Sequence, residues 1–298
     1  MNFRHILSLT ILVYFAVWSQ ENSNKSQFQG NYLGQSPPGN RPQVFASGVV
    51  STAAHEFSCS FTPDGKEFYF ARRDPKLNRN LIMVTKQIEG NWTNPEVVPF
   101  IENKVSFEPR VTPDGNRLYF SFQEGSQINI SYVERDGDNW NAPKIPGNPF
   151  NPMKSMYISV TLDGKIYTTD ISEGPGKERI AVAKKINDQY GELERLGPPI
   201  NIGKQEMYPF IAPDESYLIF NSKRSVEKNN SGLFISFKTP EGFWNKPQAI
   251  DIGMKAGCPS ISPDGKYLFF TAGEQGKSDI YWVSATRIIK KMRPKNIK

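Results

Sequence analysis

Short runs of alternating apolar and polar residues follow one another along most of the chain, and one pattern recurs five times. Each copy has a β-rich stretch, a turn of the type Ser/Thr-Pro-Asp-Gly, and a run of apolar and aromatic residues such as residues 67–70. The five turn aspartates are 50, 49, 51 and 50 residues apart, and they are Asp64, Asp114, Asp163, Asp214 and Asp264. A fixed period of this length indicates one supersecondary unit repeated in series.

The repeated turn predicts a β-hairpin. Proline presets φ for the second turn position, aspartate bonds to nearby backbone, and glycine accepts a positive φ. The apolar and aromatic residues on both sides are typical of paired strands. The third copy has Leu162 in place of proline and the fourth has Glu215 in place of glycine. Both copies keep the aspartate, so we expect the turn to persist at a small cost.

Two further strands follow the hairpin in the first four copies, and one follows it in the fifth. The third strand is predicted at residues 81–86, 128–134, 179–184, 233–238 and 279–284. An aromatic turn comes next in four copies, and its aromatic residues are Trp92, Trp140, Tyr190 and Trp244. Because the aromatic residue recurs at one repeat position, we expect it to pack between repeats. Four-stranded units of this length are typical of propeller blades.

The chain also contains the strand that closes the ring. The fifth copy ends after its third strand at Ser284, and residues 41–45 are similar to residues 246–250 and 94–98. We therefore predict an all-β, five-bladed β-propeller of four-stranded antiparallel blades over residues 41–284, with the last blade completed by an N-terminal strand. Closure would remove the exposed sheet edges. The alternative, a six-bladed ring, would need about fifty more residues that show no motif.

The two ends of the chain differ from the repeats. Residues 1–19 have Arg4, an apolar run over 6–17 and small residues at Val17 and Ser19, which predicts a cleaved signal peptide. The run is short for a membrane anchor, and no second apolar run follows. We therefore expect a periplasmic or extracellular protein without a transmembrane segment in its mature form. Residues 20–40 are polar and predict a flexible leader.

Charge is concentrated at the C-terminus. The basic tail, residues 285–298, carries six of the 36 basic residues and no acid. Without Arg4 and this tail, 29 basic residues face 30 acidic ones, which argues against nucleic acid as a partner. The tail predicts a solvated basic end, and residues 285–292 fit a short helix as well as a disordered segment.

The repeats resemble those of the TolB-like family, a group of WD-repeat-like propellers marked by Pro-Asp-Gly. The resemblance rests on the five turns, the aromatic strands after them, and strings such as residues 221–224 and 279–281. It covers residues 57–284 and implies a bacterial periplasm or cell exterior. The family includes proteins of envelope complexes and propeller domains attached to peptidases and glycan-active enzymes. No catalytic residue carries over, because the shared residues belong to turns and core.

Catalytic and metal-binding motifs are absent from the sequence. It has no G-x-S-x-G elbow, no P-loop and no Rossmann fingerprint. His55 is the single histidine after the signal segment, and no CxxC or HExxH accompanies it. We therefore predict no catalytic residue, metal or cofactor. A disulfide between Cys59 and Cys258 is a hypothesis, although their offsets from the repeat aspartate differ by one residue.

The loops opposite the Pro-Asp-Gly turns vary between copies, and variable loops on one face commonly carry the site of a repeat protein. We predict a ligand-binding face there, made of His55, Glu56, Arg72, Glu108, Arg110, Tyr157, Glu206, Tyr208 and Arg224. Glu56 and Glu206 occupy the same repeat position. They fit either a carboxylate pair acting on a glycan or structural groups that bond to backbone.

These observations predict a monomeric, non-enzymatic scaffold propeller of the cell envelope that binds a protein or a polysaccharide. The alternative is a carbohydrate-active hydrolase or lyase that uses Glu56, Glu206 or His55 at the propeller entrance. The alternative is motivated by the family resemblance and not by a motif.

Overall fold

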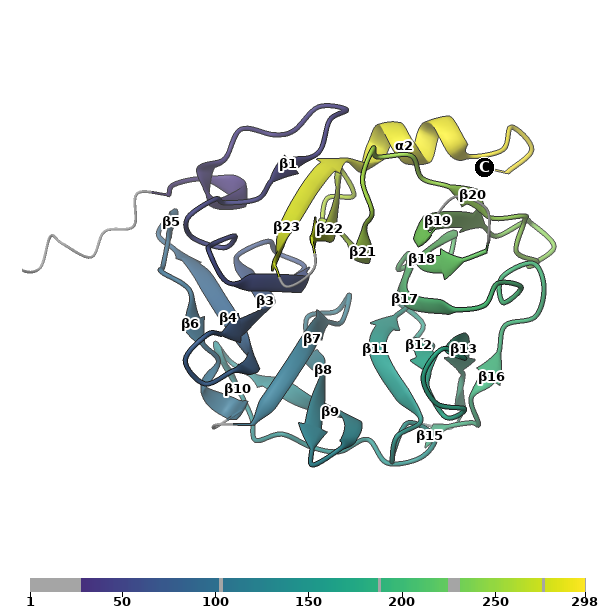
Figure 1. Ribbon diagram of the computed structural model, residues 1–298, viewed down its shortest axis with the longest axis horizontal. Helices are drawn as coiled ribbons and strands as arrows, with labels where there is room; N and C mark the ends of the chain where they lie inside the picture. The colour runs from purple at the N-terminus through teal and green to yellow at the C-terminus, as the bar shows by residue number, and fades with distance from the viewer. Residues whose placement is uncertain (1–27, 102–103, 187–188, 225–230, 275–276, 298) are drawn as a thin grey trace, which may run out of the picture.

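The fold is known from a computed structural model that describes residues 28–101, 104–186, 189–224, 231–274 and 277–297. It is an all-β ring of five blades, as predicted (Figure 1). The first two blades contain β2 (His55–Phe61), β3 (Glu67–Asp74), β4 (Arg79–Ile88), β5 (Asn91–Trp92) and β6 (Glu96–Val97), then β7 (Val105–Val111), β8 (Arg117–Glu124), β9 (Gln127–Asp136) and β10 (Asn139–Trp140).

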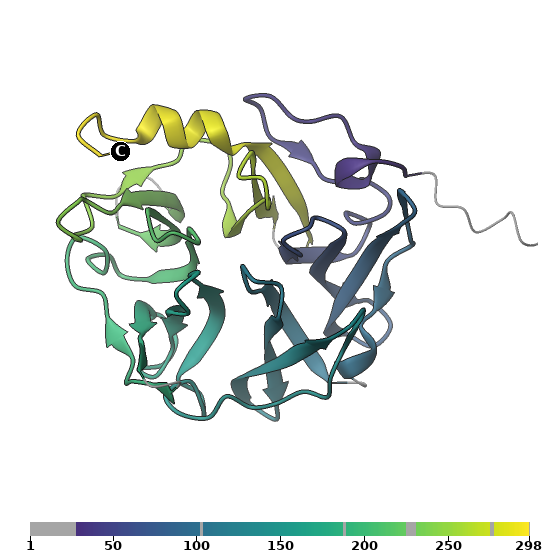
Figure 2. The ribbon, with the colours of Figure 1, turned by 180° about the vertical axis from the view of Figure 1, so that it is seen from behind.

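The other three blades repeat this order. They contain β11 (Ser155–Val160), β12 (Ile166–Asp170), β13 (Arg179–Ala183), β14 (Lys185–Ile186), β15 (Gln189–Tyr190) and β16 (Glu194–Arg195); β17 (Glu206–Ile211), β18 (Tyr217–Lys223), β19 (Ser231–Phe237) and β20 (Gln248–Ala249); and β21 (Gly257–Ile261), β22 (Tyr267–Glu274), β23 (Lys277–Ser284) and β1 (Gln43–Val44). The fourth strand of the second blade is reduced to a single bridge between Tyr132 and Lys144. The innermost strands, β2, β7, β11, β17 and β21, surround the central axis (Figures 1 and 2).

The Pro-Asp-Gly turns join the first and second strands of the blades, as predicted. In the first blade, Thr62 Oγ1 donates to Asp64 Oδ1 at 2.6 Å, and Lys66 N donates to the same oxygen at 3.0 Å. Gly65 has a φ of 71°, the left-handed conformation that favours glycine. The same side-chain bond joins Ser262 to Asp264 at 2.7 Å. The aspartate therefore fixes the turn through local hydrogen bonds.

Glu215 keeps the fourth turn despite replacing glycine. Its φ is 61°, which costs a non-glycine residue about 1 kcal/mol. Its carboxylate lies 2.8 Å from Lys165 Nζ and 2.6 Å from Lys238 Nζ, and it accepts a hydrogen bond from Tyr167. These partners come from the third and fourth blades. The strained turn is therefore stabilised by a group of ionic contacts that glycine could not make.

The aromatic turn residues pack between blades, as expected. Trp140 of the second blade donates from Nε1 to the Tyr69 hydroxyl of the first blade at 2.8 Å. Trp244 of the fourth blade makes an edge contact with Tyr167 of the third, with ring centroids 6.4 Å apart. The second and fourth blades are thus each fastened to the preceding blade by a side chain on the outer hairpin.

The N-terminal strand closes the ring. β1 pairs antiparallel with β23, and the next residue, Phe45, donates from its backbone N to Ile280 O at 2.8 Å. The Phe45 side chain is fully buried. Its ring lies 5.1 Å from that of Phe68 in the first blade and 5.0 Å from that of Phe269 in the fifth. Phe45 therefore fills the seam where the two ends of the propeller meet.

Both ends of the described chain pack against the ring. In the leader, residues 28–40 are folded onto the first and fifth blades, where Leu33 is buried and the Tyr32 ring lies 5.0 Å from that of Tyr267. At the other end, α2 (Ala285–Met292) is a helix, and Ile297 is buried beyond it. The predicted signal peptide, residues 1–19, lies outside the described residues. No described helix has the length and apolarity that spanning a membrane requires.

Phe45→Ala should lower the free energy of unfolding by about 3–5 kcal/mol, because it leaves a cavity in the closing seam. Phe243→Ala is the matched control, since Phe243 is 72% exposed, and it should change stability by no more than about 0.5 kcal/mol. Urea unfolding followed by tryptophan fluorescence measures both. Equal losses in the two variants would contradict the role given to Phe45.

Candidate functional site

A β-bulge interrupts every innermost strand at the same repeat position. The residue six places before each repeat aspartate has a φ between 47° and 59°, and these residues are Ser58, Glu108, Tyr157, Tyr208 and Cys258. The pairing of first and second strands shifts register at each of these points. Bulges re-aim side chains, and strained non-glycine residues cluster at functional sites. The centre of the ring is therefore the first place to look for a site.

Hydrogen bonds between blades hold the bulges. Ser58 N donates to Thr271 Oγ1 at 3.0 Å, and Tyr208 N donates to Thr169 Oγ1 at 2.9 Å. Each bond runs from the bulge of one blade to the second strand of the preceding blade. Bonds of this kind offset the strain of the bulge and fix the distance between neighbouring blades.

Arg110 crosses the axis and joins three blades. From the second blade, its Nη1 donates to Ser260 Oγ at 2.8 Å and its Nη2 donates to the Tyr157 hydroxyl at 2.6 Å and to Pro259 O at 3.2 Å. The residue is 5% exposed. All these partners are neutral, and its buried Nε has no hydrogen-bond partner among the described residues. Arg110 is therefore a desolvated cation whose hydrogen-bond partners among the described residues carry no charge.

A cavity of about 250 Å³ lies beside Arg110 on the axis, and we call it the axial cavity. All five blades line it. Its polar lining includes Arg110, Ser60, Ser159 and Ser260, and the prolines of four Pro-Asp-Gly turns also line it. The cavity thus lies toward the Pro-Asp-Gly turns, on the side opposite the variable loops where we predicted the ligand-binding face.

Glu108 and the two cysteines surround the same axis. Glu108 is buried and accepts a hydrogen bond from Ser121 Oγ at 2.8 Å. Burial raises its pKa to about 7, and the Ser121 bond and the Arg110 charge oppose the rise only in part. Burial also raises the pKa of the Cys59 thiol to about 12. Cys59 and Cys258 are both free, so the hypothesised disulfide is not formed.

The two carboxylates considered for glycan chemistry serve as internal acceptors. Glu56 is fully buried and accepts from Arg72 Nε at 2.8 Å and from Thr52 Oγ1 at 2.6 Å. Glu206 is also fully buried and accepts from Gly203 N at 2.7 Å. Both carboxylates fasten the loops that lead into their blades. This geometry matches the structural interpretation of the two residues.

His55 has a partner that the sequence does not reveal, Ser278, which is 223 residues away. Ser278 Oγ lies 2.9 Å from His55 Nδ1, and it donates to Glu56 O at 2.8 Å. Both contacts are hydrogen bonds at once only in the tautomer in which Ser278 donates to the carbonyl and His55 donates through Nδ1. Burial and the nearby Arg73 lower the pKa of His55. In that tautomer the imidazole does not receive the serine proton, as a base activating a nucleophile would.

The structure separates the nine predicted site residues into three groups. Arg110, Glu108, Tyr157 and Tyr208 come together at the axis, where the two tyrosine rings lie 5.3 Å apart. His55, Glu56 and Arg72 cluster on the first blade. Glu206 and Arg224 belong to the fourth blade, where Arg224 donates to Pro199 O at 2.9 Å.

Three serines of the axial cavity were missed by the sequence prediction. Ser60, Ser159 and Ser260 each stand four residues before the repeat aspartate, the position of Arg110 in the second blade. That shared offset was the available signal. Across the described residues, no three His, Cys, Asp or Glu side chains form a group able to hold a metal ion.

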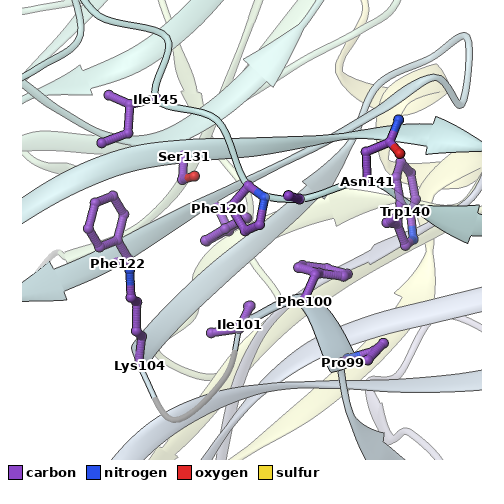
Figure 3. Close-up of a pocket in the computed structure, with 12 residues that line it drawn as sticks. Pro99, Phe100, Ile101, Lys104, Phe120, Phe122, Ser131, Trp140, Asn141 and Ile145 are labelled. Carbon is purple, nitrogen blue, oxygen red and sulfur yellow. The ribbon is translucent and has the colours of Figure 1, made fainter.

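A second hollow, the flank pocket, lies between the first and second blades (Figure 3). Its volume is about 590 Å³. Phe100, Phe122 and Trp140 supply aromatic walls, and Lys104 and Ile145 stand beside Phe122 (Figure 3). Ile145 is 62% exposed. The pocket is therefore apolar, with one cation near its edge.

No family model matches the sequence, and no curated protein matches it. Among solved structures, a protein described as TolB from Agrobacterium tumefaciens is similar at a TM-score of 0.52 and 17% identity, over 75% of this chain and 72% of that one. TolB from Acinetobacter baumannii is similar at 0.53 and 17%, over 80% of this chain and 54% of that one. This chain thus spans about half of that TolB.

The propeller fold is also shared with enzymes. An α-L-arabinofuranosidase from Lactobacillus brevis is similar at a TM-score of 0.51 and 13% identity, over 77% of this chain and 90% of that one. Identities this low establish a distant structural similarity and a common fold, and function must be argued from the site.

Glu108→Gln should become more stable relative to the wild type as pH rises. Because the folded-state pKa is about 7 and the ordinary value is 4.5, the native protein holds a proton that the unfolded chain has lost between these values. The wild type therefore loses stability across this window, by roughly 3 kcal/mol, and the amide does not. Urea unfolding at mildly acidic and mildly alkaline pH measures the difference. A difference in the free energy of unfolding between the two proteins that stays constant with pH would contradict the raised pKa of Glu108. Glu124→Gln, at an exposed position, is the control and should show no such dependence on pH.

Proposed function

We propose that this chain is an exported, non-enzymatic binding propeller of the cell envelope whose axial cavity receives an acidic group of a partner protein. The observation that carries the proposal is Arg110. Its guanidinium is buried at the axis with neutral partners only, and it lines a cavity toward the Pro-Asp-Gly turns.

An acidic ligand would relieve the electrostatic cost of this arrangement. Burying a cation without a counter-charge costs several kcal/mol, and a carboxylate offers charge-assisted bonds to a guanidinium. Glu108 is a poor counter-charge, because burial raises its pKa to about 7. The hydroxyl groups of Ser60, Ser159 and Ser260 would supply further donors to an anion.

The size of the cavity limits what enters. Sites for whole small molecules commonly have volumes of about 300–1,000 Å³, whereas the axial cavity has about 250 Å³. An aspartate or glutamate side chain, or a chain terminus, suits this volume. The rest of the partner would contact the ring of Pro-Asp-Gly turns around the opening.

The carbohydrate-active alternative has less support from the geometry. An acid–base pair must reach the sugar, and Glu56 and Glu206 are both fully buried. Ser278 Oγ donates to the backbone carbonyl of Glu56. We therefore favour binding over catalysis.

A pair of isosteric probes tests the axial site. Glutarate carries the carboxylates that Arg110 would bind, and glutaramide has the same shape without charge. Glutarate should raise the thermal midpoint of the wild type in proportion to its occupancy of the folded state, and glutaramide should not. Arg110→Met should abolish the response, while Arg41→Met, at an exposed arginine, should keep it.

The salt concentration is matched in all samples with sodium chloride. Arg110→Lys guards against a folding defect in the methionine variant, because it keeps the charge and should retain part of the response. A wild type that does not respond to glutarate, or an Arg110→Met variant that responds equally, would refute the axial site.

Export is the other half of the proposal, and it rests on the sequence of residues 1–19. Expressed with its own N-terminus in a Gram-negative host, the chain should be recovered from the periplasm or medium without these residues. Intact-mass measurement checks this outcome. A full-length protein retained in the cytoplasm would contradict the export assignment.

A further inference from the structure

The ring already binds one extended segment at a blade edge, and that segment is its own leader. Trp92 N donates to Phe28 O at 3.0 Å, and Gly30 N donates to Gly90 O at 3.1 Å, so residues 28–30 lie beside β5 as an added strand. Gln87 Nε2 also donates to Gly30 O at 2.7 Å. Main-chain bonds of this kind are how extended peptides join a sheet edge.

Aromatic side chains anchor this segment on both sides of the edge. Phe28 and Tyr32 pack against the core cluster that contains Trp92. The Tyr32 ring lies 5.5 Å from that of Trp282 in the fifth blade and 5.7 Å from that of Phe61 in the first. The leader therefore fills the space between these two blades.

The second blade presents the same edge without an occupant. β10 pairs with β9 through Asn139–Asp136 and Trp140–Arg135, as β5 pairs with β4 through Asn91–Ile88 and Trp92–Gln87. Asn141 N donates to Glu134 O at 2.9 Å, so the alternation of antiparallel bonds turns Trp140 N–H away from β9. No segment in the described ranges pairs with this outer edge of β10.

Hollows lie on both sides of β10. They are the counterparts of the spaces beside β5 that the side chains of the leader occupy. Trp140 lines the flank pocket, with its aromatic walls (Figure 3). Asn139 lines a groove of about 690 Å³ that also includes Asp64, Glu67 and Arg135. One side of the edge is thus shaped for an aromatic side chain and the other for a polar one.

Arg135 is placed to donate to a carbonyl of a bound segment, as Gln87 donates to Gly30 O of the leader. It occupies the corresponding pairing position opposite the tryptophan. Its guanidinium lies 3.9 Å from the centre of the Trp140 ring, and its Nη2 lies 2.6 Å from Glu67 Oε2. A planar donor held in this way would suit a peptide carbonyl beside the tryptophan.

We propose that the outer edge of β10 binds an extended segment of a partner protein by strand addition, with an aromatic side chain of the segment in the flank pocket. The carbonyl of that aromatic residue accepts from Trp140 N–H, and the amide two residues later donates to Asp138 O. The proposal does not depend on the axial site, since no residue of β10 lines the axial cavity.

The probe is a synthetic peptide with the sequence of residues 26–36, capped at both ends, added to the mature protein. We expect saturable binding by calorimetry and slower hydrogen exchange at residues 138–140. A peptide with sarcosine in place of the glycine at position 30 lacks the amide that bonds to the edge, and it should bind at least about tenfold more weakly.

Two isoleucines provide a matched pair of variants. Ile145→Glu places a charge at the flank pocket and should weaken binding about tenfold, because the charge must be desolvated. Ile186→Glu makes the same change at a position 60% exposed in the third blade, close to the 62% of Ile145, and should have no effect.

Two results would overturn the proposal. One is an absence of binding at millimolar peptide. The other is binding that is insensitive to Ile145→Glu and changes exchange only around residues 90–92, which would mean that the peptide displaces the leader from β5.

Discussion

The antiparallel contact between β1 and β23 is the constraint on which the rest of this structure depends. It brings together segments that are more than two hundred residues apart, and it supplies the fourth strand of the fifth blade. Phe45 completes the contact by packing against rings of both the first and the fifth blade. The axis depends on this closure, because the bulges of the first, third, fourth and fifth blades bond to the preceding blade, and the bond of the first blade crosses the closing seam.

The axis shows how closure creates an unusual environment. Five short strands converge there, and their bulges aim a serine, a glutamate, two tyrosines and a cysteine inward. Water is excluded from most of these groups, so Glu108 holds its proton near neutral pH and Arg110 bonds to neutral partners. A ring of repeats thereby gathers residue types that no single blade could bring together.

The repeat pattern was sufficient to predict blade number, turn positions and the closing strand, because these depend on local hydrogen bonds that recur with the sequence. The positions of Trp140 and Trp244 were predicted for the same reason. The candidate site was harder to predict from the sequence, because the contacts of each axial residue depend on neighbours from other blades. Glu56 and Glu206 share one repeat position, which suggested a pair, yet Glu56 bonds to Arg72 of its own blade, and Glu206 bonds to the Gly203 loop and lies 3.8 Å from Arg179 of the third blade. The partnership of His55 with Ser278 and the packing of Tyr32 on the fifth blade are long-range contacts that no periodicity encodes.

The two ends of the propeller meet. Ser284 N donates to Gly39 O at 3.1 Å, and Arg287 Nη1 donates to Asn40 Oδ1 at 2.8 Å, so the start of the closing strand and the start of α2 lie against each other (Figure 1). A short linker between them would make the backbone of the ring continuous. Circular permutation then becomes available, because new termini at an exposed inter-blade loop would leave every strand pair intact. In such a permutant the closing strand would be joined covalently to the neighbouring strand of its own blade.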